Sequence, residues 1–309
     1  MARTLLIYGE SGTYKTANGG QIADYIYETT GKLTYLASAD SSWGPMADQI
    51  RRGIICPWNL KACTMPLPAL MKASRGMWPQ RFRDVEAGIM DEKVVMVSID
   101  WSKVGAIIVE GLYMIAELLV NDLISKQRAT GEPLSAVFTE DGVNFADTSR
   151  GTYKFVQRQT NMYVTNFSAL PCRWVVFTGH EGKGRDTSGR MTMGPAVIGQ
   201  AATDKVAQWF EMTLHHDSYQ YTDPKTKAAK FGVRAYFERH PDADITNIFW
   251  PAKMSVEPMV KAQVYRLWSS GYVPLLLREN GEYESGVHTL LHVIEEAEGK
   301  LARELEVTA

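Results

Sequence analysis

Cysteine, excess charge and long apolar runs are all scarce in this sequence. Only three of its 309 residues are cysteines, and none belongs to a C-x-x-C pair, which excludes a disulfide framework and a cysteine-based zinc site. The formal net charge is -2, so there is no overall basic field, and any nucleic-acid binding must come from a local patch. These absences predict a protein of a reducing cytoplasm.

The sequence also lacks an apolar stretch long enough to cross a membrane. Its most apolar long stretch, residues 105–120, contains Glu110 and Glu117, and two charges in so short a run exclude a membrane helix. The first four residues lead directly into an apolar run, so we expect no signal peptide. With 45% hydrophobic residues the chain can bury a large core. We therefore expect a globular cytoplasmic protein without a membrane segment.

Apolar runs with strand character alternate with segments of helical spacing. Residues 4–8 form a wholly apolar run that ends at Gly9, which is typical of a buried central strand. A helical pattern over residues 15–27 and a second strand over residues 33–39 complete a unit of βαβ size. We expect further strands at residues 94–99, 106–109 and 174–178, and helices at residues 112–126 and 153–168. This alternation predicts an α/β fold with a mostly parallel central sheet.

Two segments interrupt the alternation. Residues 40–92 contain five prolines and three tryptophans, and we interpret them as an irregular insertion of loops and short helices laid over the sheet. Residues 130–150 are polar and contain glycine, which predicts a mobile loop.

Toward the C-terminus the pattern changes to that of antiparallel strands. Alternating runs at residues 218–222 and 231–239 predict a β-hairpin. From Gly286 onward, apolar residues recur at helical spacing. We therefore expect a core domain over residues 1–250 and a C-terminal helical extension over residues 251–309.

A phosphate-binding motif lies between the first strand and the first helix. It consists of Gly9, Glu10, Ser11, Gly12, Thr13, Tyr14, Lys15 and Thr16. In such a loop, backbone N–H groups and the helix N-terminus converge on a phosphate, and the helix dipole favours an anion there. We expect Lys15 to reach the β- and γ-phosphates of ATP and the Thr16 hydroxyl to bind Mg²⁺. The strand before the motif and the helix after it distinguish it from a chance match.

One position departs from the motif. The residue before the lysine is normally glycine, and here it is Tyr14. We expect Gly12 to supply the backbone freedom instead, and the aromatic ring of Tyr14 to point outward.

A carboxylate ends a second apolar strand. Four apolar residues at 106–109 precede Glu110, and this resembles a Walker B strand, whose acid binds Mg²⁺ directly or through water. Glu110 is one methylene longer than the usual Asp. Two alternatives stay open: Glu110 is a surface acid that merely ends a strand, or Asp100, which also ends an apolar run, takes the role.

The order of these elements resembles that of RecA-like ATPases, and most of all that of phage-encoded RecA-like ATPases associated with single-strand-annealing recombination. The resemblance implies that Asp40, after the second strand, activates the attacking water, and that His180, after a later strand, senses the γ-phosphate. It also implies ATP and Mg²⁺ as ligands and a homo-oligomer, either ring or filament. On their own residues, Asp40 also suits a helix N-cap, and His180 also suits an ordinary strand-end histidine.

In the same family a mobile DNA-binding loop follows the sensor strand. Here the segment 182–190 carries Lys183, Arg185 and Arg190 against one acid, Asp186. Cations on a glycine-rich loop suit contact with the phosphate backbone of single-stranded DNA without base reading. A solvated surface loop explains the same composition.

A cation from a neighbouring subunit is the last element that the resemblance implies. Arg239 is our preferred candidate, ahead of Arg234 and Lys253. We interpret the pair His215 and His216 at a strand end as structural.

Three functions remain open at this stage. The first is an ATP-driven protein that acts on nucleic acid. The second is a nucleotide-gated structural or regulatory module with little hydrolysis, which the departures at Tyr14 and Glu110 favour. The third is a P-loop small-molecule kinase, although the sequence offers no arginine-rich lid.

Overall fold

The computed structural model describes residues 2–39, 43–60, 63, 66–79, 95–130, 148–185, 191–196, 206–222, 227–238, 252–277 and 283–308. Within them, six strands run parallel to one another: β1 (Arg3–Gly9), β2 (Leu33–Ser38), β3 (Ile55–Asn59), β6 (Val104–Glu110), β7 (Trp174–Arg185) and β9 (Met212–Thr222). Antiparallel partners are β8 (Met191–Pro195), β10 (Ala229–Tyr236), β11 (Lys253–Met254), β12 (Tyr272–Leu277) and β13 (Tyr283–Ser285).

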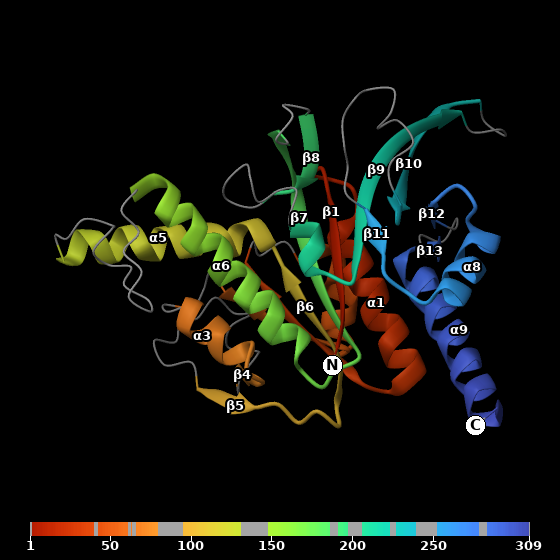
Figure 1. The fold of residues 1–309 in the computed structure, drawn as a ribbon, viewed down its shortest axis with the longest axis horizontal. Coiled ribbons are helices and arrows are strands. Elements are labelled where there is room, and N and C mark those ends of the chain that lie inside the picture. The colour runs from red at the N-terminus through yellow and green to blue at the C-terminus, as the bar shows by residue number, and fades with distance from the viewer. Residues whose placement is uncertain are drawn as a thin grey trace.

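These strands form one sheet in the order β13-β12-β10-β9-β1-β7-β6-β2-β3, with β11 paired to β9 and β8 paired to β7. A separate two-stranded sheet joins β4 (Met77–Pro79) and β5 (Met96–Ser98). The predicted α/β fold is confirmed: the centre of the sheet is parallel, and antiparallel strands are added toward the C-terminus. The carboxyl ends of the parallel strands lie at the upper edge in Figure 1, where β7 to β10 extend beyond the rest.

Helices cover both faces of the sheet (Figure 1). The described helices are α1 (Lys15–Thr30), α2 (Ala47–Arg51), α3 (Pro66–Ala73), α5 (Leu112–Thr130), α6 (Thr148–Ser168), α8 (Pro258–Leu267) and α9 (Val287–Thr308), with 3-10 turns η1 (Gly44–Met46) and η3 (Ala207–Trp209). Helices α3, α5 and α6 pack on one face, and α1, α8 and α9 pack on the other.

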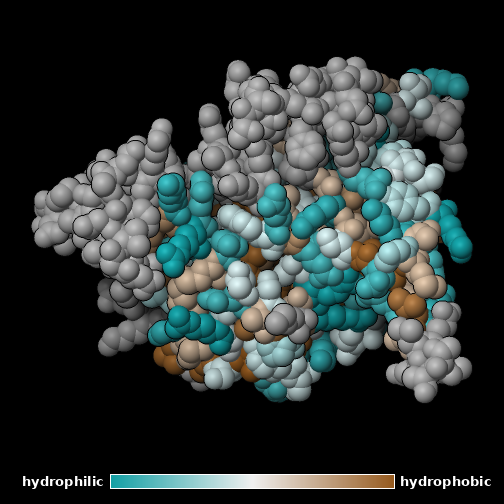
Figure 2. Space-filling model, in the orientation of Figure 1, coloured by the Kyte–Doolittle hydropathy of each residue, from teal (hydrophilic) through white to brown (hydrophobic). Residues whose placement is uncertain are grey.

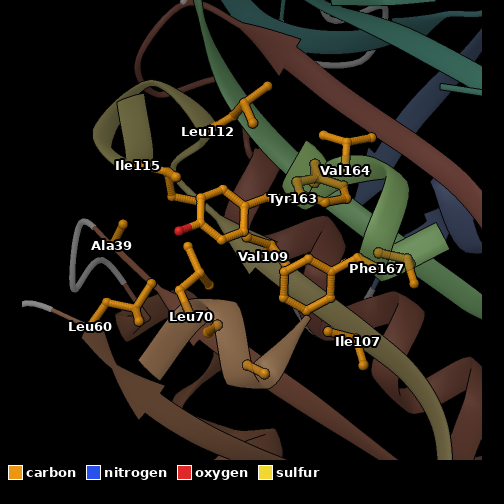
Figure 3. Packing of buried hydrophobic residues seen from close by; sticks show 14 of the residues in the cluster. Ala39, Leu60, Leu70, Ile107, Val109, Leu112, Ile115, Tyr163, Val164 and Phe167 are labelled. Carbon is orange, nitrogen blue, oxygen red and sulfur yellow. The ribbon is translucent and has the colours of Figure 1, made fainter. Parts of the chain in front are cut away.

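The sheet separates two hydrophobic cores, because successive side chains of a strand point to opposite faces. In β1, Leu6 belongs to the core beneath α5 and α6, whereas Leu5 and Ile7 belong to the core beneath α1 and α9. Figure 3 shows the first core, in which Tyr163 and Phe167 of α6 lie against Ile107 and Val109 of β6. A strand that is apolar on both faces is typical of a sheet covered on both faces, and β1 and β6 are buried in this way on either side of β7.

The segment 40–92 contributes more than loops and short helices. Its residues 55–59 form β3, which pairs in parallel with β2, and this part of the prediction is wrong. Pro57 concealed the strand because proline removes a ladder donor. The sheet tolerates it since β3 is the last strand at its edge. The strand expected at 94–99 is also shorter, and it pairs with β4 instead of joining the central sheet.

The predicted mobile loop at 130–150 overlaps a helix. Residues 148–150 belong to α6, whereas 131–147 lie outside the described residues.

The segment 251–309 is not purely helical. It supplies α8 and α9 but also β11, β12 and β13 of the main sheet. Glu295 of α9 accepts hydrogen bonds from Tyr25 of α1 and from the Trp174 indole of β7, the latter at 2.6 Å, and it pairs with Arg173. These partners of the part-buried carboxylate connect α9 to α1 and to the central sheet.

Hydrophilic residues cover much of the described surface on the face shown in Figure 2. On the face shown in Figure 2, apolar residues form small, separate patches. Large exposed apolar residues such as Phe231 and Leu267 are scattered over different elements, which is normal for a folded protein. No helix among the described residues combines the length and apolar character that a membrane crossing requires.

Candidate nucleotide-binding site

The phosphate-binding loop lies where the sheet offers a ligand site. Strand β1 sits between β7 and β9, and its carboxyl end passes into the loop and then into α1. A cavity of about 670 Å³ opens there, lined by residues 11–17, by Gly44 and Pro45, and by Gly111 and residues 178–180. Ligands bind outside the carboxyl ends of strands in open α/β sheets, and this volume is typical of a small-molecule site.

Lys15 is held inside the loop by the loop itself. Its ammonium group donates hydrogen bonds to the carbonyl oxygens of Gly9 at 3.0 Å and Glu10 at 2.5 Å, and to the Thr13 hydroxyl at 3.3 Å. The Thr13 hydroxyl donates to the Glu10 carbonyl at 2.8 Å. A buried positive charge therefore lies at the cavity wall, beside the N-terminus of α1, whose first turn has no acidic residue. Both features attract an anion.

Tyr14 adopts the left-handed conformation that a glycine would favour. Its backbone has φ 57° and ψ 22°, and Gly12 is also left-handed with φ 81°. The expectation that Gly12 would replace the missing glycine is only half right, because both positions need the unusual backbone. The Tyr14 side chain is 47% exposed, in agreement with an outward ring. For a non-glycine residue this conformation costs about 1–2 kcal/mol.

Glu110 is a buried acid and not a surface one. It is 1% exposed and its two oxygens accept hydrogen bonds from the Thr16 hydroxyl at 2.5 Å and the Ser38 hydroxyl at 3.0 Å. Asp100, the competing candidate, lies at the surface, where Ser102 and Lys103 lower the pKa of its carboxyl by hydrogen bonding. The structure thus brings Thr16 and Glu110 together, whereas Asp100 is exposed and contacts Ser102 and Lys103.

Sequence reasoning missed Ser38. It lies at the end of β2, directly opposite Glu110 in the ladder between β2 and β6. It is fully buried, and its hydroxyl orients the carboxylate toward Thr16. The only available signal was its place two residues before Asp40, at the end of the same apolar run. Asp40 itself lies outside the described residues.

His180 lies in the cavity wall. It follows Thr178 and Gly179, which line the same cavity, and the Thr178 hydroxyl accepts a hydrogen bond from the Gly111 amide at 3.2 Å. The strand does not end at His180, however, because β7 continues to Arg185. His180, the residue expected to sense the γ-phosphate, thus lines the same cavity as the phosphate-binding loop.

The basic segment, residues 182–190, begins as a β-strand. Residues 182–185 are strand, paired with β8, so the prediction of a loop is wrong there. Alternating glycines do not prevent this pairing. Gly182 also approaches Ala196 closely, since an added Cβ would lie 3.1 Å from the Ala196 Cα and Cβ atoms. Lys183 and Arg185 lie opposite Met193 and Met191 in the ladder. Their side chains, and all of Arg190, lie outside the described part of the chain.

The three candidates for a cation that reaches a neighbouring subunit differ in their surroundings. Arg239 lies outside the described residues. Arg234 is occupied within its own chain, since it pairs with Asp217 at 3.0 Å and stacks over the Tyr219 ring at 4.3 Å. Lys253 lies half-buried in β11, where burial lowers the pKa of its ammonium group.

His216 contacts the loop, which its interpretation as a structural residue did not foresee. Its Nδ1 lies 2.8 Å from the Thr13 carbonyl oxygen, across 203 positions of sequence. The ring is 1% exposed, and burial lowers the pKa of His216 to about 3, against the ordinary 6.5. Because a carbonyl only accepts, Nδ1 carries the proton, and the ring is neutral at physiological pH.

Protein side chains alone do not form a metal cage in the described residues, since no three His, Cys, Asp or Glu residues gather there. A Mg²⁺ that arrives with a nucleotide needs fewer protein ligands, because phosphates and waters supply the rest. The hydroxyl of Thr16 beside the carboxylate of Glu110 fits that requirement.

No model of a known protein family and no curated protein sequence matches the chain. Solved structures do resemble it. A KaiC-like protein from the hyperthermophilic archaeon Pyrococcus horikoshii OT3 superposes with a TM-score of 0.40 at 10% identity, over 92% of this chain and 89% of that one. The flagellar accessory protein FlaH from Methanocaldococcus jannaschii gives 0.39 at 9% identity, with the same coverage. Likeness at this level does not say what the chain binds.

Proposed function

We propose that the chain is a RecA-like P-loop ATPase that binds ATP with Mg²⁺ and hydrolyses it. The observation that carries the proposal is that Lys15 and Thr16 line one cavity at the carboxyl edge of the sheet, and that the Thr16 hydroxyl donates a hydrogen bond to the buried carboxylate of Glu110. A positive charge, a hydroxyl and a buried carboxylate in this arrangement suit a magnesium-bound polyphosphate.

The residues have separate tasks in this proposal. The backbone N–H groups of the loop and the ammonium of Lys15 bind the phosphates, and Thr16 with Glu110 holds Mg²⁺. When bound, the metal would neutralise negative charge on the phosphates. Ser38 keeps the carboxylate of Glu110 in place, and His180 contacts the terminal phosphate from the neighbouring strand.

Hydrolysis requires a group that orients the attacking water. We assign this role to Asp40, which follows β2 by two residues. Strand β2 neighbours β6 in the sheet, with Ser38 opposite Glu110. The end of β2, which Asp40 follows in the sequence, therefore lies beside the proposed metal site.

In this proposal the ATPase acts on nucleic acid, and single-stranded DNA is the preferred class. Strand β7 runs from the cavity wall at His180 to Arg185 and includes Lys183, and Arg190 follows in the sequence. Cations here would bind the phosphate backbone without reading bases. We further propose that copies assemble into a ring or filament, with Arg239 as the cation that reaches a neighbour's nucleotide.

The decisive experiment measures ATP turnover with and without single-stranded DNA. We expect magnesium-dependent turnover that Lys15→Ala abolishes and that DNA stimulates in a salt-sensitive manner. Turnover that DNA does not change, together with no salt-sensitive DNA binding, would refute the nucleic-acid role.

A nucleotide-gated module with little hydrolysis is the second candidate. The strained backbone at Tyr14, where the motif has glycine, favours it. Tight ATP binding with negligible turnover in the wild-type chain would select this second function over the first.

A further inference from the structure

Strand β9 passes close to the phosphate-binding loop at His216, which is the ladder partner of Gly9. A Cβ added to Gly9 would lie 2.3 Å from the His216 carbonyl oxygen, so only glycine fits where the loop begins. On the other side of the loop, Nδ1 of His216 donates to the Thr13 carbonyl at 2.8 Å. His216 therefore contacts the loop at its first and its fifth residue.

The peptide that His216 holds is one the nucleotide would use. A trans peptide points its C=O and its N–H in opposite directions. With the Thr13 carbonyl turned to His216, the N–H of Tyr14 points away from His216. Thr13, Tyr14 and Lys15 all line the cavity, and loop N–H groups are the phosphate ligands of this motif.

This peptide needs an external restraint. Tyr14 is in the left-handed region, which side-chain-bearing residues rarely adopt. Glycine would make that backbone easy, whereas tyrosine makes it unfavourable, so the loop is not held in this shape by local preference alone. A hydrogen bond from a buried group on a neighbouring strand supplies the restraint.

The strand that carries His216 is itself held in place by a neighbouring residue pair. On the opposite face of β9, Nε2 of His215 lies 2.7 Å from a carboxylate oxygen of Glu181 in β7, and both side chains are buried. Strand β1 lies between β7 and β9, so this pair ties the two neighbours of the loop strand together at its carboxyl end. The ring centroid of Tyr8 from β1 lies 4.9 Å from that of His215.

We propose that His216 is a positioning residue, which fixes the direction of the Thr13–Tyr14 peptide and so presents the Tyr14 N–H to the bound phosphate. The inference rests on the proposed nucleotide-binding function. The inference requires a hydrogen-bond donor at the position of Nδ1 and at no other, whereas a merely structural histidine would not require one there.

Two variants distinguish the need for a donor at Nδ1 from a role of His216 in packing. In His216→Asn the amide nitrogen can take the place of Nδ1, whereas in His216→Gln the longer side chain carries its donor toward the place of Nε2. His292→Asn, on the exposed side of α9, is the matched control. ADP with Mg²⁺ is the probe, the dissociation constant is the readout, and thermal melting reports whether each variant folds.

We expect His216→Gln to weaken ADP binding by roughly five- to tenfold, the order expected for one hydrogen bond to a buried carbonyl. His216→Asn should stay within about twofold of the wild type, and the control should not change. Equal binding by His216→Gln and the wild type, or equal losses in both His216 variants, overturns the inference. A wild-type chain that binds no ADP instead overturns the proposed function itself.

A measurement on the unmodified chain covers the case in which the variants do not fold. Nitrogen NMR of the ¹⁵N-labelled histidines distinguishes the two neutral tautomers. We expect a signal from a neutral ring protonated at Nδ1 that changes when ADP is added. A His216 ring protonated at Nε2 would contradict the inference, since it could not donate to Thr13.

Discussion

Replacing Tyr14 tests the most unusual backbone feature of the site. Tyr14→Gly and Tyr14→Ala remove the same half-exposed ring and differ only in the residue that must occupy φ 57°. The left-handed region costs alanine about 1–2 kcal/mol of folding stability. Glycine avoids this cost, but the greater conformational entropy of its unfolded chain lowers folding stability by about 0.4–1 kcal/mol relative to alanine. The glycine variant should therefore be the more stable of the two, by about 1 kcal/mol.

Tyr27 provides the matched control. It is 42% exposed and lies inside α1, where the backbone is helical. There the order should reverse, with Tyr27→Gly less stable than Tyr27→Ala by about 1 kcal/mol. Urea unfolding of the four nucleotide-free variants measures each difference. If glycine is the less stable residue at both positions, the left-handed backbone at Tyr14 is wrong.

Three further results are expected. Gly9→Ala should destabilise the fold by about 3 kcal/mol in urea unfolding, because its Cβ meets the His216 carbonyl at 2.3 Å, whereas Gly44→Ala, with no neighbour within 4 Å, should change little. Ser38→Ala should lower kcat/KM for ATP by roughly tenfold, since it removes a donor to the buried carboxylate, and the exposed Ser102→Ala should leave kcat/KM unchanged; equal values for both would contradict the role of Ser38. The pKa of His216 is depressed from 6.5 to about 3, so the unfolded chain takes up the proton first as pH falls below 6.5. Between pH 7.5 and 5 the wild type should lose about 2 kcal/mol more unfolding free energy than His216→Asn. Parallel pH profiles for the two proteins would show that His216 is not buried as a neutral ring.

The parts of the site that were predictable are those encoded in short segments. Residues 9–16 combine a strand end, glycines, a lysine and a helix start within eight positions. Glu110 directly follows four apolar residues of one strand. Both signals are local, and the structure brings Thr16 and Glu110 together as expected. The α/β fold followed from the same local periodicities.

The parts that were missed depend on which segments meet in space. Ser38 matters because of the register between β2 and β6, which no local pattern reveals. His216 meets Thr13 across 203 positions, and the pairing of β1 with β9 brings them together. Pro57 suppressed the strand signal of β3 although its place at the sheet edge permits it. In each case tertiary pairing overrides what the residue indicates on its own.

The most direct test of the central claim is a calorimetric titration of the wild-type chain and Lys15→Ala with a non-hydrolysable ATP analogue, with and without Mg²⁺. We expect saturable binding to the wild type that Mg²⁺ strengthens, and a loss of at least about tenfold in affinity when the buried ammonium is removed. Binding of equal strength to both chains, or no binding to the wild type, would contradict the assignment of this cavity as a nucleotide site.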